Sequence, residues 1–318
     1  MSTDIERPHI VFATDFSPWA AQAEAYALCL ASTWRASLTV VTVLEFQPGM
    51  NPEYEVNRLY LDELMKSAKK ELAALTERAA ARGIAVQTRM ATGIPSEEIL
   101  GAARAEDADV IVMGTKGKTG LAHVLLGSTA ERVIRSASCP VLAVRAELSD
   151  GTLVDPHPCA GVSVRRILVP VDFSDCSLEA LEYAAWLAQR SGASLSLLHV
   201  LEPISYGLDF TLSHEPKREE MRARVTQRLA GFVEALAGAK IAADSHVRGG
   251  LPADSILDSA RTLPADVIVM GTHGRRGLSH LLSGSVTEAV LRQSRCPVMT
   301  VRSPKYAAGH RRVIPVSS

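Results

Sequence analysis

Residues Val110–Val144 read VIVMGTKGKTGLAHVLLGSTAERVIRSASCPVLAV and carry the clearest structural signal in the chain. An apolar run opens the segment, a glycine-rich part follows, and a second apolar run begins after Cys139-Pro140. Residues Thr129–Ser136 lie between the two runs and are expected to form a helix. Short, continuous apolar runs on either side of a helix are typical of parallel strands buried on both faces.

The same segment returns 157 positions later, at Val267–Val301, where it reads VIVMGTHGRRGLSHLLSGSVTEAVLRQSRCPVMTV. Gly114–Val141 and Gly271–Val298 are identical at 15 of 28 positions without a gap. The same offset relates Thr14-Asp15-Phe16-Ser17 to Val171-Asp172-Phe173-Ser174 near the start of each copy. A repeat that keeps its register over this length predicts a duplicated domain of about 150 residues.

Each copy alternates apolar runs with longer helical patterns, which predicts parallel strands joined by right-handed helical crossovers. The expected strands of the first copy are Ile10–Ala13, Ser37–Val43, Val86–Met90, Val110–Met113 and Val141–Val144. Its expected helices are Pro18–Ser32, Glu55–Arg82, Ser96–Glu106 and Thr129–Ser136. The expected strands of the second copy are Ile167–Val171, Ser194–Val200, Asp244–Arg248, Val267–Met270 and Val298–Val301. We therefore expect two tandem, doubly wound α/β sandwiches, each with a five-stranded parallel sheet.

The boundaries of the two copies follow from where the periodicity stops. We assign residues 1–146 to the first domain and residues 165–303 to the second. Residues 147–164 contain glycine and proline without hydrophobic periodicity and are expected to be a linker. Residues 304–318 are expected to form an irregular tail.

Composition excludes several classes of partner and location. The 318 residues include 34 Lys and Arg against 35 Asp and Glu, which gives a formal net charge of -1. This balance lacks the positive field that bulk binding to nucleic acid or to an anionic membrane needs. No apolar run approaches the roughly 20 residues that span a bilayer. Charged Asp4, Glu6 and Arg7 stand where a signal peptide would be apolar, so we expect a cytoplasmic protein.

Cysteine and histidine give no metal-binding pattern. The five cysteines are scattered without a CxxC pair, and the nine histidines form no HExxH. We expect reduced, mostly buried thiols, with Cys139 and Cys296 packed at the starts of the fifth strands. No metal site is expected.

A glycine-rich motif follows the fourth strand of each copy and is the first candidate for chemistry. Its spacing is G-2x-G-9x-G-S, and its members are Gly114, Gly117, Gly127 and Ser128 in the first copy and Gly271, Gly274, Gly284 and Ser285 in the second. Glycines let backbone N–H groups approach a ligand, and the following helix start favours an anion. The alternative is that Ser128 is only an N-cap and that the glycines only close a turn. Two intact copies favour a phosphate-bearing ligand.

An aspartate ends the first strand of each copy, at Asp15 and Asp172. In a doubly wound sheet, strands one and four can flank the topological switch point where ligands bind. A carboxylate there can accept hydrogen bonds from a ribose hydroxyl or a base amine. The alternative is that Asp15 or Ser17 caps the following helix. The position at the switch point favours the ligand.

Other polar residues near the glycine motif give weaker signals. Basic residues in these loops offer either phosphate contacts or a solvated surface, namely Lys116, Lys118, His273, Arg275 and Arg276. A P-loop is excluded, because Val112 stands where its first glycine would be. His123 and His280 match across the repeat, but no evident nucleophile accompanies them, so loop packing is favoured.

With these motifs, the chain resembles a tandem universal stress protein from about His9 to Val301. The resemblance rests on the Thr14–Ser17 and Val171–Ser174 segments, the two glycine motifs and the Cys-Pro-Val elements. It implies the Rossmann-like fold of that family and one adenine nucleotide (ATP, ADP or AMP) in each domain. Mg²⁺ would enter bound to the phosphates.

The resemblance also implies a set of nucleotide contacts. Asp15 and Asp172 would meet the base or ribose, Val43 and Val200 would flank the adenine, and the glycine motifs would hold ribose and phosphates. The full set is Ala13, Thr14, Asp15, Val43, Met113, Gly114, Gly117, Gly127, Ser128, Thr129, Pro170, Val171, Asp172, Val200, Met270, Gly271, Gly274, Gly284, Ser285 and Val286. One departure is that Ala13 stands where the family often has the proline found at Pro170.

The implied function is a nucleotide-binding sensor or regulator in the stress response, without an evident catalytic residue. A slow ATPase or another nucleotide-handling enzyme is the first alternative, and a ligand-free interaction protein is the second. The family pairs domains through the fifth strands, which implies a pseudo-dimer within this chain and leaves a homodimer open. The stress, the protein partner and the preferred nucleotide do not follow from the sequence.

Overall fold

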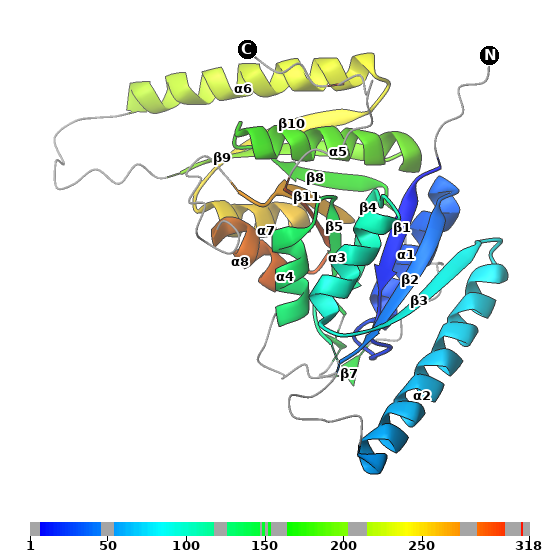
Figure 1. Cartoon of the computed structure of the whole chain (residues 1–318). Coiled ribbons are helices and arrows are strands. Elements are labelled where there is room, and N and C mark those ends of the chain that lie inside the picture. The colour runs from blue at the N-terminus through cyan, green and yellow to red at the C-terminus, as the bar shows by residue number, and fades with distance from the viewer. Residues whose placement is uncertain are drawn as a thin grey trace, which may run out of the picture. The chain divides into compact units, whose positions relative to one another are not determined.

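The structure is a computed structural model that describes residues 7–45, 54–117, 126–146, 148–149, 152–153, 164–202, 215–273, 285–302 and 313. The chain divides into two units, Met1–Ser163 and Val164–Ser318. Each unit is built around its own parallel sheet (Figure 1).

Unit 1 contains a five-stranded parallel sheet in the order β3-β2-β1-β4-β5. The strands are β1 (His9–Ala13), β2 (Ser37–Leu44), β3 (Val86–Thr92), β4 (Val110–Gly114) and β5 (Val141–Val144). The helices are α1 (Ala21–Trp34), α2 (Glu55–Ala80), α3 (Pro95–Ala105) and α4 (Ser128–Ser136). Helices α1 and α2 pack against the sheet and are joined by the Arg78–Glu24 ion pair, and α3 packs beside α4. A doubly wound fold has two such groups of helices, one on each face of the sheet.

Unit 2 repeats this arrangement with the order β10-β9-β8-β11-β12. The strands are β8 (Arg166–Pro170), β9 (Ser194–Leu201), β10 (Ala243–Gly249), β11 (Val267–Gly271) and β12 (Val298–Val301). The helices are α5 (Asp175–Ser191), α6 (Glu215–Gly238), α7 (Pro252–Thr262) and α8 (Ser285–Gln293). Within the units, α2 packs along β3 and α6 along β10 (Figure 1). The expected doubly wound fold is confirmed in both copies.

The core of each unit consists of aliphatic strands covered by one face of each helix. Ile10, Val11 and Phe12 of β1 are 0% exposed, because both faces of the central strand are covered. On α2 the buried stripe is Ala68, Leu72, Leu75 and Ala79, and on α6 it is Val225, Leu229, Phe232 and Leu236. The two stripes differ by 157 positions, so the sequence repeat is also a repeat in burial.

The segment expected to be an irregular linker contains a short antiparallel ladder. β6 (Leu148–Ser149) pairs with β7 (Thr152–Leu153). Asp150-Gly151 stands between them in the sequence, and this dipeptide favours two-residue hairpins. The hairpin was predictable from that dipeptide.

No helix within the part of the chain that the structure describes is both long enough and apolar enough to cross a membrane.

Candidate functional site

The sheet order brings the ends of two particular strands together in each unit. In unit 1, β1 pairs with β2 on one side and with β4 on the other. The chain therefore winds outward from β1 to β3, returns to β4, and continues to β5 in the opposite direction. This reversal is the topological switch point, where the carboxyl ends of β1 and β4 bound a crevice. The expected neighbourhood of these two strands is confirmed.

A tight turn follows β1 and fixes the first predicted acid. The Asp15 Oδ1 accepts a hydrogen bond from the Ser17 N–H at 3.0 Å, and the Thr14 Oγ1 accepts one from the Phe16 N–H at 3.0 Å. Phe16 has a φ of +56°, a left-handed conformation that bulky residues rarely adopt. The side-chain hydrogen bonds on either side stabilise this turn, so Asp15 is held in place before any ligand binds.

Unit 2 has the same turn with an additional helix cap. The Asp172 Oδ1 accepts hydrogen bonds from the Ser174 N–H at 2.9 Å and from its hydroxyl at 2.5 Å. The Ser174 Oγ in turn accepts the Ser177 N–H at 3.3 Å and caps α5. Phe173 has a φ of +63°. Ser174 is therefore the residue that caps α5, and Asp172 holds the Ser174 hydroxyl in place. The second carboxylate oxygen of Asp172, Oδ2, takes no part in these hydrogen bonds.

The glycine motif of unit 1 reaches the acid at the switch point. A Cβ on Gly117 would lie 2.8 Å from the Asp15 Oδ2, closer than real Cβ atoms come to an oxygen. Only glycine lets the backbone after β4 pass this close to the carboxylate. The fold therefore brings together the two features that the sequence singled out separately.

The end of the motif positions the start of α4. The Gly127 N–H donates a hydrogen bond to the Thr115 O at 2.7 Å, which ties the loop to the end of β4. Gly127 is the N-cap, and no side chain caps this helix. Ser128 is thus the first helical residue and is exposed, so the interpretation of Ser128 as an N-cap is wrong. N–H groups of a first helical turn without a side-chain cap are suited to an anion.

The first glycine of each motif lies against the first helix of its unit. A Cβ on Gly114 would be 3.3 Å from the Trp19 O and 3.3 Å from the Lys116 O. A Cβ on Gly271 would be 2.8 Å from the Cys176 Sγ and 2.9 Å from the Cys176 carbonyl oxygen. Both glycines allow helix and strand to approach closely, a packing role that the sequence interpretation did not assign to them.

Two residues at matching positions distinguish the rims of the two crevices. In unit 1, the Lys116 Nζ lies 4.9 Å from the centre of the Trp19 ring, a cation–π contact. In unit 2, Cys176 replaces the tryptophan, and its thiol donates a hydrogen bond to the Val301 O at 3.1 Å. Trp19 and Cys176 stand 157 positions apart, so they occupy the same place in the two copies. The change of residue type at this matched position is the signal in the sequence from which the difference between the two units could have been found.

Unit 2 also has an aromatic cluster beside its acid. The Phe173 ring lies 4.9 Å from the His199 ring, and the Arg228 guanidinium lies 4.2 Å from the centre of the phenyl ring. The buried His199 is within 2.6 Å of the Val171 O, to which its Nδ1–H donates. The position on α2 that matches Arg228 is Glu71. At this pair of matched positions, unit 2 therefore has a positive charge and unit 1 a negative one.

The remaining predicted contact residues divide by burial. Ala13, Thr14, Met113, Val171 and Met270 are buried, which limits them to the floor of a site. The side chains of Val43, Thr129, Pro170, Val200 and Val286 are half-buried, and Ser285 is exposed at the start of α8. Five other residues named from the sequence lie outside the described residues, as do two glycines of the second motif. The five are Lys118, His123, Arg275, Arg276 and His280, and the glycines are Gly274 and Gly284.

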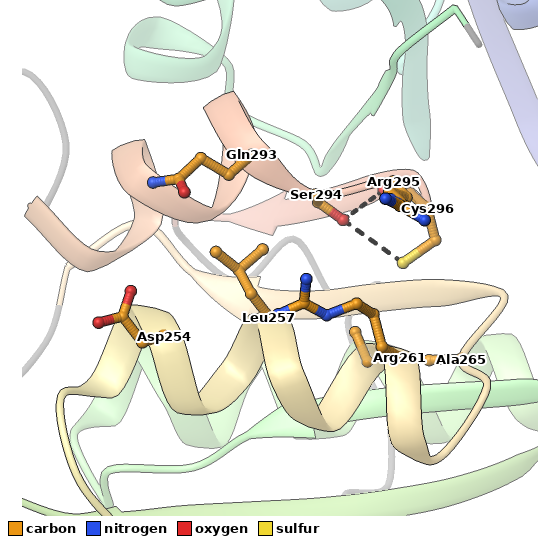
Figure 2. Close-up of a pocket in the computed structure, with 9 residues that line it drawn as sticks. Asp254, Leu257, Arg261, Ala265, Gln293, Ser294, Arg295 and Cys296 are labelled. Carbon is orange, nitrogen blue, oxygen red and sulfur yellow. Dashed lines mark hydrogen bonds between the residues drawn. The ribbon is translucent and has the colours of Figure 1, made fainter. Parts of the chain in front are cut away.

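A pocket of about 410 Å³ in unit 2 lies at the opposite, amino-terminal edge of the sheet. Figure 2 shows α7 on one side of it and the segment after α8, from Gln293 to Cys296, on the other. The Ser294 hydroxyl donates to the Cys296 O at 2.7 Å, and its Oγ lies 3.5 Å from the Sγ. Burial raises the pKa of the Cys296 thiol, which keeps it protonated and a poor nucleophile at neutral pH. The pocket is separate from the switch point and holds no activated thiolate.

The fold defines a tandem, doubly wound α/β protein in which the same aspartate turn follows the first strand of each unit. The model of the universal stress protein family matches residues 6–145 and 163–302, most of both units. The chain belongs to the universal stress protein family.

Individual relatives agree with this assignment. The chain is 39% identical to the universal stress protein MJ0531 of Methanocaldococcus jannaschii over 137 residues, which cover 43% of this chain and 81% of that protein. It is 29% identical over 270 residues to a universal stress protein of Mycolicibacterium smegmatis, covering 85% of this chain and 83% of the relative. A universal stress protein from Archaeoglobus fulgidus DSM 4304 has a similar fold, with a TM-score of 0.68, 24% identity and coverage of 92% of this chain and 98% of that one.

Proposed function

We propose that each unit binds one adenine nucleotide at its switch point and that the chain acts as a nucleotide-dependent sensor or regulator. The observation that carries the proposal is the approach of Gly117 to the Asp15 Oδ2. A carboxylate and a glycine loop that meet at the carboxyl ends of two parallel strands are suited to a nucleotide, because one accepts hydrogen bonds and the other supplies N–H donors.

The contacts follow from the chemistry of each part. Asp15 and Asp172 accept hydrogen bonds from a ribose hydroxyl or the base amine, beside the half-buried Val43 and Val200. The phosphates lie toward the starts of α4 and α8, where free N–H groups and the helix dipole favour negative charge. Mg²⁺ would be bound through the phosphate oxygens, since the described residues contain no cluster of three or more His, Cys, Asp or Glu that could hold an ion.

The description as a regulator rather than a fast enzyme rests on the groups at the crevice. Asp15 and Asp172 are engaged by backbone N–H groups of their own turns, which suits them to orient a ligand. Slow ATP hydrolysis is the alternative within the same site. Phosphate release above the rate of an Asp15→Asn and Asp172→Asn double variant would favour it.

The test is to count the nucleotides that the protein carries. Freshly purified protein is denatured, and the released nucleotides are identified and quantified by chromatography and mass spectrometry. Two adenine nucleotides per chain are expected, or two binding events when ATP and Mg²⁺ are titrated into protein that was purified empty. Binding of no nucleotide under either condition would overturn the proposal and favour a ligand-free interaction protein.

Single variants assign the sites. Asp15→Asn is expected to remove one nucleotide per chain and Asp172→Asn the other. Glu77→Gln is the matched control, because it makes the same change from carboxylate to amide on the exposed face of α2, near the end of that helix. Equal loss in the control would show that the effect is not specific to the switch point.

A further inference from the structure

The segments that lead into the strands of unit 2 carry an excess of positive charge. These segments are residues 164–166, 190–194, 238–243, 261–266 and 293–297, and each is followed by one strand of the sheet. They contain six cations and one acid, a net charge of +5. The strands are parallel, so the segments lie together along the amino-terminal edge of the sheet. We call this edge the basic face of unit 2, after its six cations Arg165, Arg166, Arg190, Lys240, Arg261 and Arg295.

The same segments of unit 1 carry little excess charge. They lie 157 positions earlier, at residues 7–9, 33–37, 81–86, 104–109 and 136–140. They contain four cations and three acids, a net charge of +1 with histidine neutral. Helix carboxyl-terminal ends at this edge attract cations through the helix dipole, but both units have the same helix ends. The fold alone therefore does not account for the additional positive charge of unit 2.

Unit 2 offsets little of the charge on its basic face. The single acid, Asp266, accepts hydrogen bonds through its Oδ2 from the backbone N–H groups of Arg165 and Arg166, at 2.7 and 2.9 Å. The Arg166 guanidinium donates to the Leu263 O at 3.1 Å. Among the described residues, no carboxylate forms an ion pair with the four exposed cations Arg165, Lys240, Arg261 and Arg295. Their charge is thus not neutralised by the described part of the chain.

Two pockets open on the basic face, and each is lined by two of these four cations. Arg261 and Arg295 line the pocket of about 410 Å³, where the Arg261 guanidinium lies between α7 and the segment after α8 (Figure 2). Arg165 and Lys240 line a second pocket of about 290 Å³, beside the ends of α5 and α6. A carboxylate that enters either pocket meets two positive charges.

We propose that the basic face of unit 2 is a docking surface for an acidic segment of a partner protein. The two pockets lie on opposite faces of the sheet, because α5 and α6 cover one face and α7 and α8 the other. Cations spread over this width suit an extended chain with several carboxylates better than one small anion. The net charge of -1 for the whole chain favours such a segment over a nucleic acid, which needs a larger positive field.

Fluorescence anisotropy of the full-length protein, with labelled decaglutamate as the probe, tests this surface. The wild type is expected to bind the peptide at low ionic strength and to bind it more weakly as salt is added. A variant with Arg165→Gln, Lys240→Gln, Arg261→Gln and Arg295→Gln is expected to bind about tenfold more weakly, because four exposed charges are lost together. Thermal unfolding of the variant shows that the fold is kept.

The matched control removes the same number of charges from the corresponding segments of unit 1. It combines Arg7→Gln, Arg35→Gln, Arg82→Gln and Arg104→Gln and is expected to bind the peptide as the wild type does. Equal weakening in both variants would overturn the proposal, because binding would then follow net charge alone. Absence of binding to the wild type at low salt would also overturn it, as would tighter binding of decathymidylate at the same salt concentration.

Two smaller variants separate the pockets and need fewer substitutions in one chain. Arg261→Gln with Arg295→Gln, and Arg165→Gln with Lys240→Gln, are each expected to weaken binding about threefold. Unchanged binding in both would contradict the docking surface. The basic face lies at the edge of the sheet away from the switch point, so all these variants are expected to keep their nucleotide content. The outcome therefore does not depend on the proposed function.

Discussion

At the scale of single residues, the crevice depends on side chains that are held before a ligand arrives. Asp15 and Asp172 each accept a hydrogen bond from the N–H of the serine two positions further along the chain. The phenylalanine between each aspartate and its serine has a positive φ. The turn thus fixes the carboxylates at the ends of β1 and β8, and a ligand need not order them.

Gly117 is the residue whose replacement tests the site most directly. The Gly117→Ala and Gly274→Ala double variant is expected to remain folded and to lose nucleotide, because the new Cβ at position 117 would displace the Asp15 carboxylate. Thermal unfolding and the count of released nucleotides measure the two properties separately. Unchanged nucleotide content in a folded double variant would contradict the assignment of the loop.

Cys296 gives a prediction about reactivity and pH. Because burial raises the pKa of its thiol, the thiolate is scarce in the folded protein, and alkylation by iodoacetamide at neutral pH is expected to be slower than in urea. Since the folded pKa exceeds the unfolded one, this thiol favours the folded state below the unfolded pKa, and the contribution declines as the pH rises above it. Peptide mass spectrometry follows the rate at Cys296, and equal rates in the folded and unfolded protein would contradict the burial.

At the scale of elements, close approach of helix and strand explains where glycine is needed. Gly271 ends β11 directly against the first turn of α5, whereas Gly231 lies within α6 with open space around it. These two glycines have opposite expected responses to the same substitution.

Gly271→Ala is expected to lower the free energy of unfolding by about 1–3 kcal/mol, because the new methyl group would overlap Cys176. Gly231→Ala is expected to raise it by about 0.5–1 kcal/mol, because alanine restricts the unfolded chain and favours the helix. Urea denaturation of both variants provides the comparison. A stabilising Gly271→Ala would show that α5 does not pack as described.

At the scale of the whole molecule, duplication produced two crevices with different surroundings. Unit 2 has Arg228 over Phe173, whereas the matching position in unit 1 is Glu71. A positive charge near a crevice favours anionic ligands, and a negative charge opposes them.

We therefore expect unit 2 to bind ATP more tightly than unit 1. Arg228→Ala in an Asp15→Asn background, which leaves only the second site, is expected to weaken ATP binding about threefold to fivefold, the modest effect of an exposed charge. Arg224→Ala is the control, because Arg224 pairs with Glu220 on the exposed surface of the same helix. Calorimetric titration at two salt concentrations measures the difference, and an equal effect of the control would attribute it to net charge.

The sequence by itself determined the duplication, the parallel strands and the glycine motifs, because each of these depends on local pattern. Continuous aliphatic runs such as Val110–Met113 can only be buried strands here, and a 157-residue offset is visible without coordinates. Helix starts were less certain, since Gly127 rather than Ser128 caps α4.

Only the tertiary structure decided which distant groups meet. The approach of Gly117 to Asp15, the Arg228–Phe173 contact and the bond from Val313 to Glu182 each join segments far apart in the chain. Such contacts depend on how helices pack against the sheet and on where each long side chain reaches. Periodicity shows which face of an element is buried, but the partner that buries it is set by packing across the whole unit.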